Sequence, residues 1–195
     1  MTLSPDVDNL IRRTRDGDLH AFHQLYDQYS KRVLNFSYRL TGSRETAEEV
    51  TQETFISVFK NMKALKDTSR FEPWLFMIAR NFVYQVYRRK RLPTVSTDET
   101  DEDNREIVHL EDTDSTPEEQ LLRGELQQVA RQVIQSLALK YREVFVLAVL
   151  EGFSYQEVAK LVGRKPQSVK TDIHRARLMI RERLARYIRE GSVEA

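Results

Sequence analysis

A strongly acidic block separates two basic parts of this 195-residue chain. Residues 97–119 read TDETDEDNREIVHLEDTDSTPEE, and Arg105 is the only basic residue among them. Residues 92–119 hold one Lys or Arg against 11 Asp and Glu, whereas residues 1–91 hold 16 against 11 and residues 120–195 hold 14 against eight. A stretch this polar, in which like charges repel one another, predicts an extended linker between two small domains. Such a linker could span up to about 80 Å.

The composition excludes several classes of protein. The chain has no cysteine, which excludes disulfides and thiolate metal sites and is typical of a reducing cytoplasm. No apolar run approaches the roughly 20 residues of a membrane span. The first residues, MTLSPDVDNL, lack the basic and then apolar layout of a signal peptide. We therefore expect a soluble, cytoplasmic protein.

Apolar residues recur at helical spacing nearly everywhere outside 92–116, and no convincing alternating pattern appears, so the chain is predicted to be all-α. We expect a helical domain over 1–91, the acidic linker over 92–116 and a second helical domain over 117–195. Capping boxes are predicted at Ser69–Glu72 and at Ser154–Glu157. The helical spacing assigns Tyr26, Phe59 and Leu126 to the core. The expected helices cover about 5–17, 19–40, 44–62, 70–91, 117–137, 139–150, 155–162 and 166–189.

The segment SYQEVAKLVGRKPQSVKTDIHRARLMIRERL has the layout of a helix-turn-helix, with a Gly-containing turn before a longer basic helix. In this arrangement the first helix holds the second so that its N-terminal end can enter the major groove of DNA. The alternative is an amphipathic hairpin with a solvated basic face. Candidate contacts with bases and phosphates are Gln167, Ser168, Lys170, Thr171, His174 and Arg175.

The basic helix also carries a lone histidine and, near its N-terminal end, an acidic residue. His174 has no second His, Cys or carboxylate beside it at a ligand spacing, so we predict no metal site and no cofactor. Asp172 would repel phosphate if it faced the groove, unless it accepts a hydrogen bond from cytosine or is held by Lys170 or Arg175.

A second basic segment, KALKDTSRFEPWLFMIARNFVYQVYRRKR, combines aromatic and cationic side chains, as single-stranded nucleic-acid binding requires. Taken alone, Phe71, Trp74 and Phe82 at helical spacing fit a core better than a stacking platform. Asn81, Tyr84 and Tyr87 are better candidates for exposed positions. The segment AEEVTQETFISVFKNM carries an acidic face that, by itself, fits a solvated surface.

Taken in order, these segments resemble the extracytoplasmic-function sigma factors of bacterial RNA polymerase, the group IV members of the sigma-70 family. The likeness rests on FHQLYDQYSKRVLNFSYRLTGS, AEEVTQETF, RFEPWLFMIARN, LLRGELQQVARQVIQSLALKYREVFVL, EGFSYQEVAKLVG and SVKTDIHRARLMIRERL, and covers nearly the whole chain. It implies a sigma-two-like domain that captures the melted minus-ten element and a sigma-four-like domain that reads the minus-thirty-five duplex. The loop near Leu65 departs from the common family pattern, so the promoter sequence cannot be carried over.

The resemblance also assigns candidate sites and partners. It implies no enzymatic activity and no small-molecule substrate. The partners that it implies are core RNA polymerase (the beta-prime clamp and the beta flap), promoter DNA and an anti-sigma factor, which is often membrane-bound. The acidic linker is a hypothetical occupant of the path that RNA takes through polymerase. The alternative function is an autonomous helix-turn-helix regulator with a helical sensor or dimerisation domain. The implied minus-ten contacts are Leu65, Lys66, Asp67, Arg70, Asn81, Tyr84 and Arg88, and the implied contacts with core polymerase are Glu48, Glu49, Gln52, Glu53 and Phe55.

Overall fold

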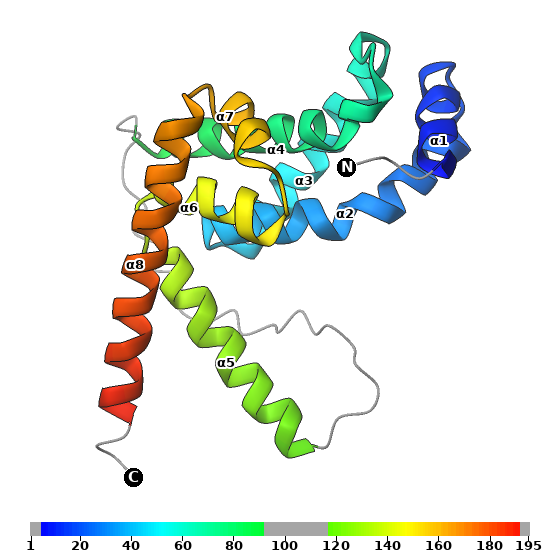
Figure 1. Cartoon of the computed structure of the whole chain (residues 1–195). Helices are drawn as coiled ribbons and strands as arrows, with labels where there is room; N and C mark the ends of the chain where they lie inside the picture. Colours follow the sequence, from blue (N-terminus) through cyan, green and yellow to red (C-terminus); the bar gives the residue numbers. More distant parts are fainter. Residues whose placement is uncertain (1–4, 92–116, 192–195) are drawn as a thin grey trace.

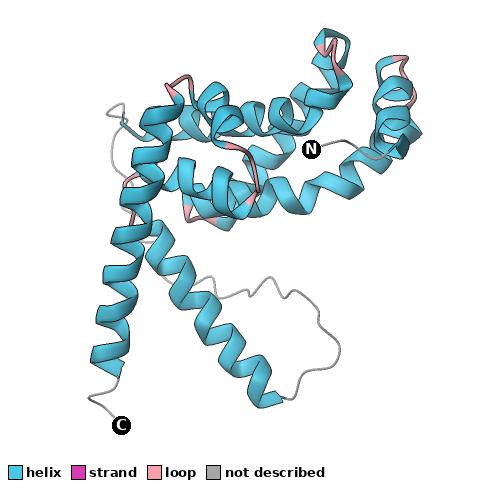
Figure 2. Ribbon diagram, viewed as in Figure 1, coloured by secondary structure: helices cyan, strands magenta, loops and turns pink. Residues whose placement is uncertain are grey.

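The computed structural model describes residues 5–91 and 117–191, and every regular element in these two ranges is helical, as predicted (Figures 1 and 2). The predicted acidic linker lies outside the described residues. The main helices are α1 (Pro5–Arg15), α2 (Leu19–Thr41), α3 (Arg44–Asn61), α4 (Phe71–Arg91), α5 (Pro117–Gln135), α6 (Leu139–Phe145), α7 (Tyr155–Val162) and α8 (Pro166–Gly191).

Short-range hydrogen bonds set most helix ends close to their predicted positions. The Asp18 carboxylate accepts from the backbone amides of His20 and Ala21 at the start of α2. Gly42 ends that helix in the left-handed conformation, with φ of 79°. The predicted capping box at Ser154 and Glu157 is confirmed at the start of α7.

The second predicted capping box is wrong. Thr68–Arg70 forms a 3₁₀ turn capped by Asp67, whose carboxylate accepts from the Ser69 amide at 3.1 Å, and α4 begins after it. Glu72 points instead towards α2, where it accepts from the Tyr29 hydroxyl at 3.1 Å and from Arg32 at 3.0 Å. A partly buried arginine competes successfully for the carboxylate because a charge-assisted hydrogen bond is the stronger one.

Three residues assigned to the core by their spacing are instead exposed: Tyr26 by 39%, Phe59 by 40% and Leu126 by 66%. The Tyr26 ring meets Phe55 of the neighbouring helix at 4.8 Å and the Phe59 ring meets Phe22 at 4.9 Å, so each is in contact on one side while the rest of the ring stays open to solvent. Tyr87 was predicted to be exposed, but it is partly buried, and its hydroxyl donates to the Leu40 carbonyl at 2.8 Å. Phe71 is fully buried, as predicted.

The helix predicted over 139–150 changes character after Phe145. Val146–Leu150 forms a π-helical turn, which ends with the Glu151 amide donating to the Val146 carbonyl at 2.9 Å. Such turns are rare and frequently lie at functional sites. This turn carries the chain directly into Glu151, whose side chain is buried.

The helices before and after the linker pack against each other. Helices α1 to α4 form a bundle, α6 contacts α2, and α7 lies against α4 (Figure 1). One cluster of buried apolar side chains includes residues of both halves, and Phe76 of α4 meets Phe153 edge to face at 5.3 Å. Helix α5 and the end of α8 extend away from this body (Figure 1).

Candidate nucleic-acid and polymerase interfaces

Helices α7 and α8 form the predicted helix-turn-helix. Gly163 makes the turn in the left-handed conformation with φ of 67°. Val158 and Val162 of α7 are buried, as are Val169 and Ile173 of α8, and these four side chains belong to one apolar cluster. The six predicted contact residues, Gln167, Ser168, Lys170, Thr171, His174 and Arg175, are all exposed around the N-terminal half of α8.

Asp172 belongs to the framework of this motif. It is 6% exposed and forms an ion pair with Arg164, which stands in the turn between the two helices. Neither Lys170 nor Arg175, the partners considered from the sequence, holds it. The sequence analysis did not identify Arg164 as the partner of Asp172. The signal was present, because Arg164 is a basic residue in the turn, eight residues before an acidic residue that needed a partner.

The loop before α4 offers polar groups around a buried anchor. Leu65 is 6% exposed and packs inward, whereas Lys66, Asp67 and Arg70 are exposed. The Asp67 carboxylate accepts from the Ser69 hydroxyl at 2.6 Å and lies 3.2 Å from Arg70. The hydrogen bond from Ser69 holds the pKa of Asp67 below its ordinary value. These contacts hold the polar groups of the loop in fixed positions before any ligand binds.

The remaining predicted minus-ten residues lie along α4. Asn81 and Arg88 are exposed. Tyr84 is partly buried, and its hydroxyl donates to Glu143 of α6 at 2.8 Å. Burial, together with the Glu143 charge, raises the pKa of Tyr84 to about 12. Tyr84 is thus neutral, and its hydroxyl is already occupied by the other half of the molecule.

A groove joins this loop to the helix-turn-helix. Trp74 and Met77 of α4 give it an apolar floor, and Arg70 and Lys160 add cationic groups from opposite halves. Sequence analysis did not place Lys160 here, because its helical pattern gives no sign that α7 would lie against α4.

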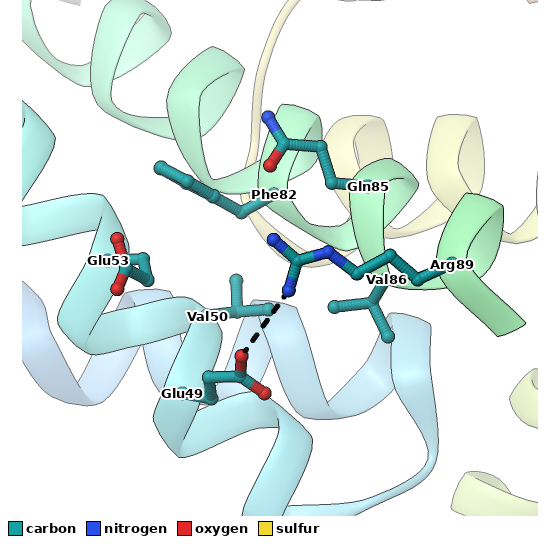
Figure 3. A pocket seen from close by; sticks show the side chains of 7 residues that line it. All are labelled: Glu49, Val50, Glu53, Phe82, Gln85, Val86 and Arg89. Atoms are coloured by element: carbon teal, nitrogen blue, oxygen red, sulfur yellow. Dashed lines mark ion pairs between the residues drawn. The ribbon is translucent and has the colours of Figure 1, made fainter.

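The acidic face of α3 lies beside the basic end of α4. Figure 3 shows a pocket between the two helices, where Arg89 reaches towards Glu49 with 4.0 Å between the charged atoms and Glu53 stands on the same wall. Glu48 pairs with Arg44 on its own helix at 2.9 Å. Arg89 is a neighbour of the predicted polymerase contacts that sequence analysis did not assign.

The other predicted polymerase contacts border an apolar groove. Gln52 is exposed, whereas Phe55 is 3% exposed and supports the surface from beneath. The exposed apolar side chains are those of Tyr26, Ile56 and Phe59, which line the groove with Gln52. Ile56 stands four residues after Gln52, so the helical period could have identified it.

Comparison with known proteins decides the family. Residues 25–92 match Sigma-70 region 2, and residues 127–180 match Sigma-70, region 4. An ECF RNA polymerase sigma-E factor of Haemophilus influenzae is 31% identical over 178 residues, covering 90% of this chain and 93% of the relative. The chain belongs to the ECF sigma factors. It is therefore an alternative sigma factor, a protein that directs RNA polymerase to start transcription.

Other relatives support this family assignment for the sigma factor. An RNA polymerase sigma-H factor of Pseudomonas aeruginosa is 32% identical over 185 residues, covering 93% of this chain and 95% of the relative. A solved structure of CnrH in complex with the cytosolic domain of CnrY superposes with a TM-score of 0.66 at 23% identity, covering 92% of this chain and 97% of CnrH. The sigma factor RpoE of Bartonella quintana, solved with the anti-sigma factor NepR, gives 0.65 at 21% identity, covering 84% and 96%. At these identities the two structures show a shared fold.

Within residues 5–91 and 117–191 of the sigma factor, no group of three or more His, Cys, Asp and Glu is placed to hold a metal ion. No helix in these ranges is both long and apolar enough to cross a membrane.

Proposed function

We propose that this sigma factor recognises promoters in two parts. Region 4, carried by the domain at 117–195, reads the minus-thirty-five duplex, and region 2, carried by the domain at 1–91, captures the melted minus-ten strand. The observation that carries this proposal is the exposure of all six candidate contact residues at the N-terminal half of α8. This is the end of a recognition helix that enters the major groove.

The duplex contacts divide by chemistry. Arg175 and Lys170 supply cations for guanine edges or phosphates, and Gln167 can pair with adenine. Thr171 donates its hydroxyl to the Gln167 carbonyl at 3.0 Å, so its remaining role towards DNA is that of an acceptor or of an apolar methyl contact. The ion pair between Asp172 and Arg164 keeps the acidic group away from the phosphates.

The strand-capturing surface is the loop 65–70 together with α4. Lys66, Arg70 and Arg88 would follow the phosphates, and Asn81 would bond the edge of an extruded base. Leu65 would act through its packing, because its side chain is buried. Trp74, on the floor of the groove beside Arg70, is a stacking surface of the right chemistry.

The face of α3 is the proposed contact with the beta-prime clamp of core polymerase. Its acidic rim of Glu48, Glu49 and Glu53 borders the exposed Gln52 and the apolar groove over Phe55. Apolar side chains surrounded by charged ones are a common layout of protein interfaces. Region 4 would contact the beta flap.

The sigma factor itself would carry out no chemical step, and it would act in the cytoplasm on polymerase and DNA. An anti-sigma factor is a further proposed partner, since the structurally similar RpoE was solved with the anti-sigma factor NepR. Its binding would hide the surfaces that polymerase needs.

Promoter-specific transcription by purified core polymerase tests the function. The sigma factor should direct initiation at a defined set of promoters that core polymerase alone does not use. Tight sequence-specific duplex binding without core, and no transcription with it, would contradict the proposal and favour an autonomous helix-turn-helix regulator.

A further inference from the structure

Two buried carboxylates of region 4 are held by side chains of region 2. Glu143 of α6 is 2% exposed, and it accepts from the Arg80 guanidinium at 2.9 Å and from the Tyr84 hydroxyl at 2.8 Å. Both donors stand on α4. No hydrogen-bond partner of this carboxylate in the described residues comes from region 4 itself.

Glu151 repeats this arrangement at the other end of the contact. Its side chain is 3% exposed, and it accepts from Arg32 at 3.2 Å and from Arg39 at 3.1 Å, both on α2. The π-helical turn before it delivers the carboxylate to this place. Arg32 also binds Glu72 at 3.0 Å, so one guanidinium joins carboxylates of both halves.

Further contacts between the halves accompany these carboxylate pairs. Phe76 meets Phe153 edge to face, and the Leu40 carbonyl at the end of α2 accepts a hydrogen bond from the Arg142 guanidinium of α6. Desolvation offsets much of the attraction within a buried ion pair, so these pairs add little net strength to the contact between the halves. A contact of little net strength can release when polymerase binds.

The contact engages groups that the proposed function needs free. Tyr84 belongs to the proposed minus-ten surface, and Arg80 directly precedes Asn81. The element names place the two promoter sites about 25 base pairs apart, which is roughly 85 Å of B-form DNA. In the packed molecule α4 touches α7, and Arg70 of the strand-capturing surface lines the same groove as Lys160 of the helix-turn-helix. Two surfaces that lie side by side cannot reach sites that far apart, so the halves must separate.

We propose that the free sigma factor is autoinhibited by a carboxylate latch, in which Glu143 and Glu151 of region 4 occupy basic and hydroxyl groups of region 2 until the halves separate on polymerase. This inference rests on the proposed function only in that promoter binding is the activity that the latch inhibits. The latch itself is a contact within the free chain, whatever that chain binds.

The first experiment measures closure in the full chain without polymerase. The chain has no cysteine, so Lys31→Cys and Glu182→Cys, at two exposed positions, can carry a donor and an acceptor dye. Removing the latch with Glu143→Gln, or with Arg39→Gln from the opposite side, should lower energy transfer. The matched control is Arg12→Gln, which removes an arginine that pairs with Asp8 at 3.0 Å within α1 alone.

The second experiment measures access to the strand-capturing surface. A labelled mixed-sequence single-stranded DNA of about 12 nucleotides, within the range of known single-strand sites, is titrated onto each variant. Both latch variants should bind it about tenfold more tightly than the parent chain, because a site that is open in about a tenth of the parent molecules binds about tenfold more weakly than one that is always open. Arg12→Gln should bind it as the parent does. If the helical circular dichroism signal of Glu143→Gln is lower than that of the parent chain, this variant has partly unfolded, and the comparison is made with Arg39→Gln instead.

Energy transfer and oligonucleotide affinity unchanged in a folded latch variant would overturn the proposal. Transcription with core polymerase separates this failure from that of the proposed function. A chain that transcribes normally but shows no opening refutes the latch alone, whereas a chain that opens but starts no transcription at promoters refutes the proposed two-part promoter recognition.

Discussion

Asp172, buried on the inner side of α8, forms an ion pair with Arg164 in the turn that precedes the helix. The pair ties the start of the recognition helix to the turn that orients it. An acidic residue that would repel DNA from an exposed position therefore serves the DNA-binding motif from within.

We expect Asp172→Asn to destabilise region 4 and to weaken duplex binding. Arg164 is partly exposed, so solvent screens the pair and the loss of unfolding free energy should be about 1–2 kcal/mol. Urea unfolding and titration with minus-thirty-five duplex measure the two effects. Arg164→Met should reproduce both, and a normal stability in both variants would contradict this role.

Arg175→Ala should weaken binding of the minus-thirty-five duplex by about 1–3 kcal/mol and relax base preference at one position, if the guanidinium reads a base. Titration with duplexes that vary at each position measures both. Arg186→Ala, an exposed arginine further along α8, is the control and should leave base preference intact. Unchanged affinity and preference in Arg175→Ala would remove Arg175 from the site.

Asn81→Ala should impair strand separation while leaving upstream binding intact, because the amide would pair with an extruded base. Open-complex formation can be followed by permanganate reactivity of unpaired thymines, and upstream binding by footprinting. The control is Gln28→Ala, which removes an exposed amide from α2. Normal melting by Asn81→Ala would count against the proposed role.

The capping box of α7 predicts a pH-dependent stability. Hydrogen bonds from the Ser154 hydroxyl and amide lower the pKa of Glu157 below its ordinary value of 4.5. A carboxyl whose pKa is lower in the folded state stabilises it above the ordinary value, and this contribution is lost as pH falls through the lowered pKa. Urea unfolding between neutral pH and pH 3 measures it.

Ser154→Ala should cost about 1 kcal/mol of unfolding free energy at neutral pH. Glu157→Gln is the matched variant, because glutamine can keep the reciprocal hydrogen bond but does not titrate. It should therefore show a smaller loss of stability between neutral pH and pH 3. An equal acid dependence in Glu157→Gln and the parent would show that other carboxyl groups control the transition.

Local hydrogen-bond chemistry explains why much of the fold could be predicted. Ser154 and Glu157 stand three residues apart, so the backbone itself brings them together once the helix starts. Gly163 and Gly42 end helices because their left-handed conformations suit glycine. Helical spacing also predicted the six exposed candidate contact residues of α8, because the side of a helix on which a residue lies depends only on its position along that helix.

The predictions failed where a distant partner competed with a local one. Glu72 had a capping partner three residues away, yet it bonds Arg32, 40 residues earlier in the chain. Tyr84 was expected at an exposed position, and its hydroxyl is held by Glu143, 59 residues later. Periodicity describes which side of a helix is apolar, but not which other helix will meet it.

The sequence by itself determined the helices, the helix-turn-helix and the division of charge, because these depend on neighbours within a few residues or on composition. Only the tertiary structure decided that Glu143 and Glu151 are buried on arginines 63 and 119 residues away. The physical reason is that a carboxylate leaves water only where a cation and a packed apolar surface arrive together. That meeting is a property of how the two halves of the chain pack.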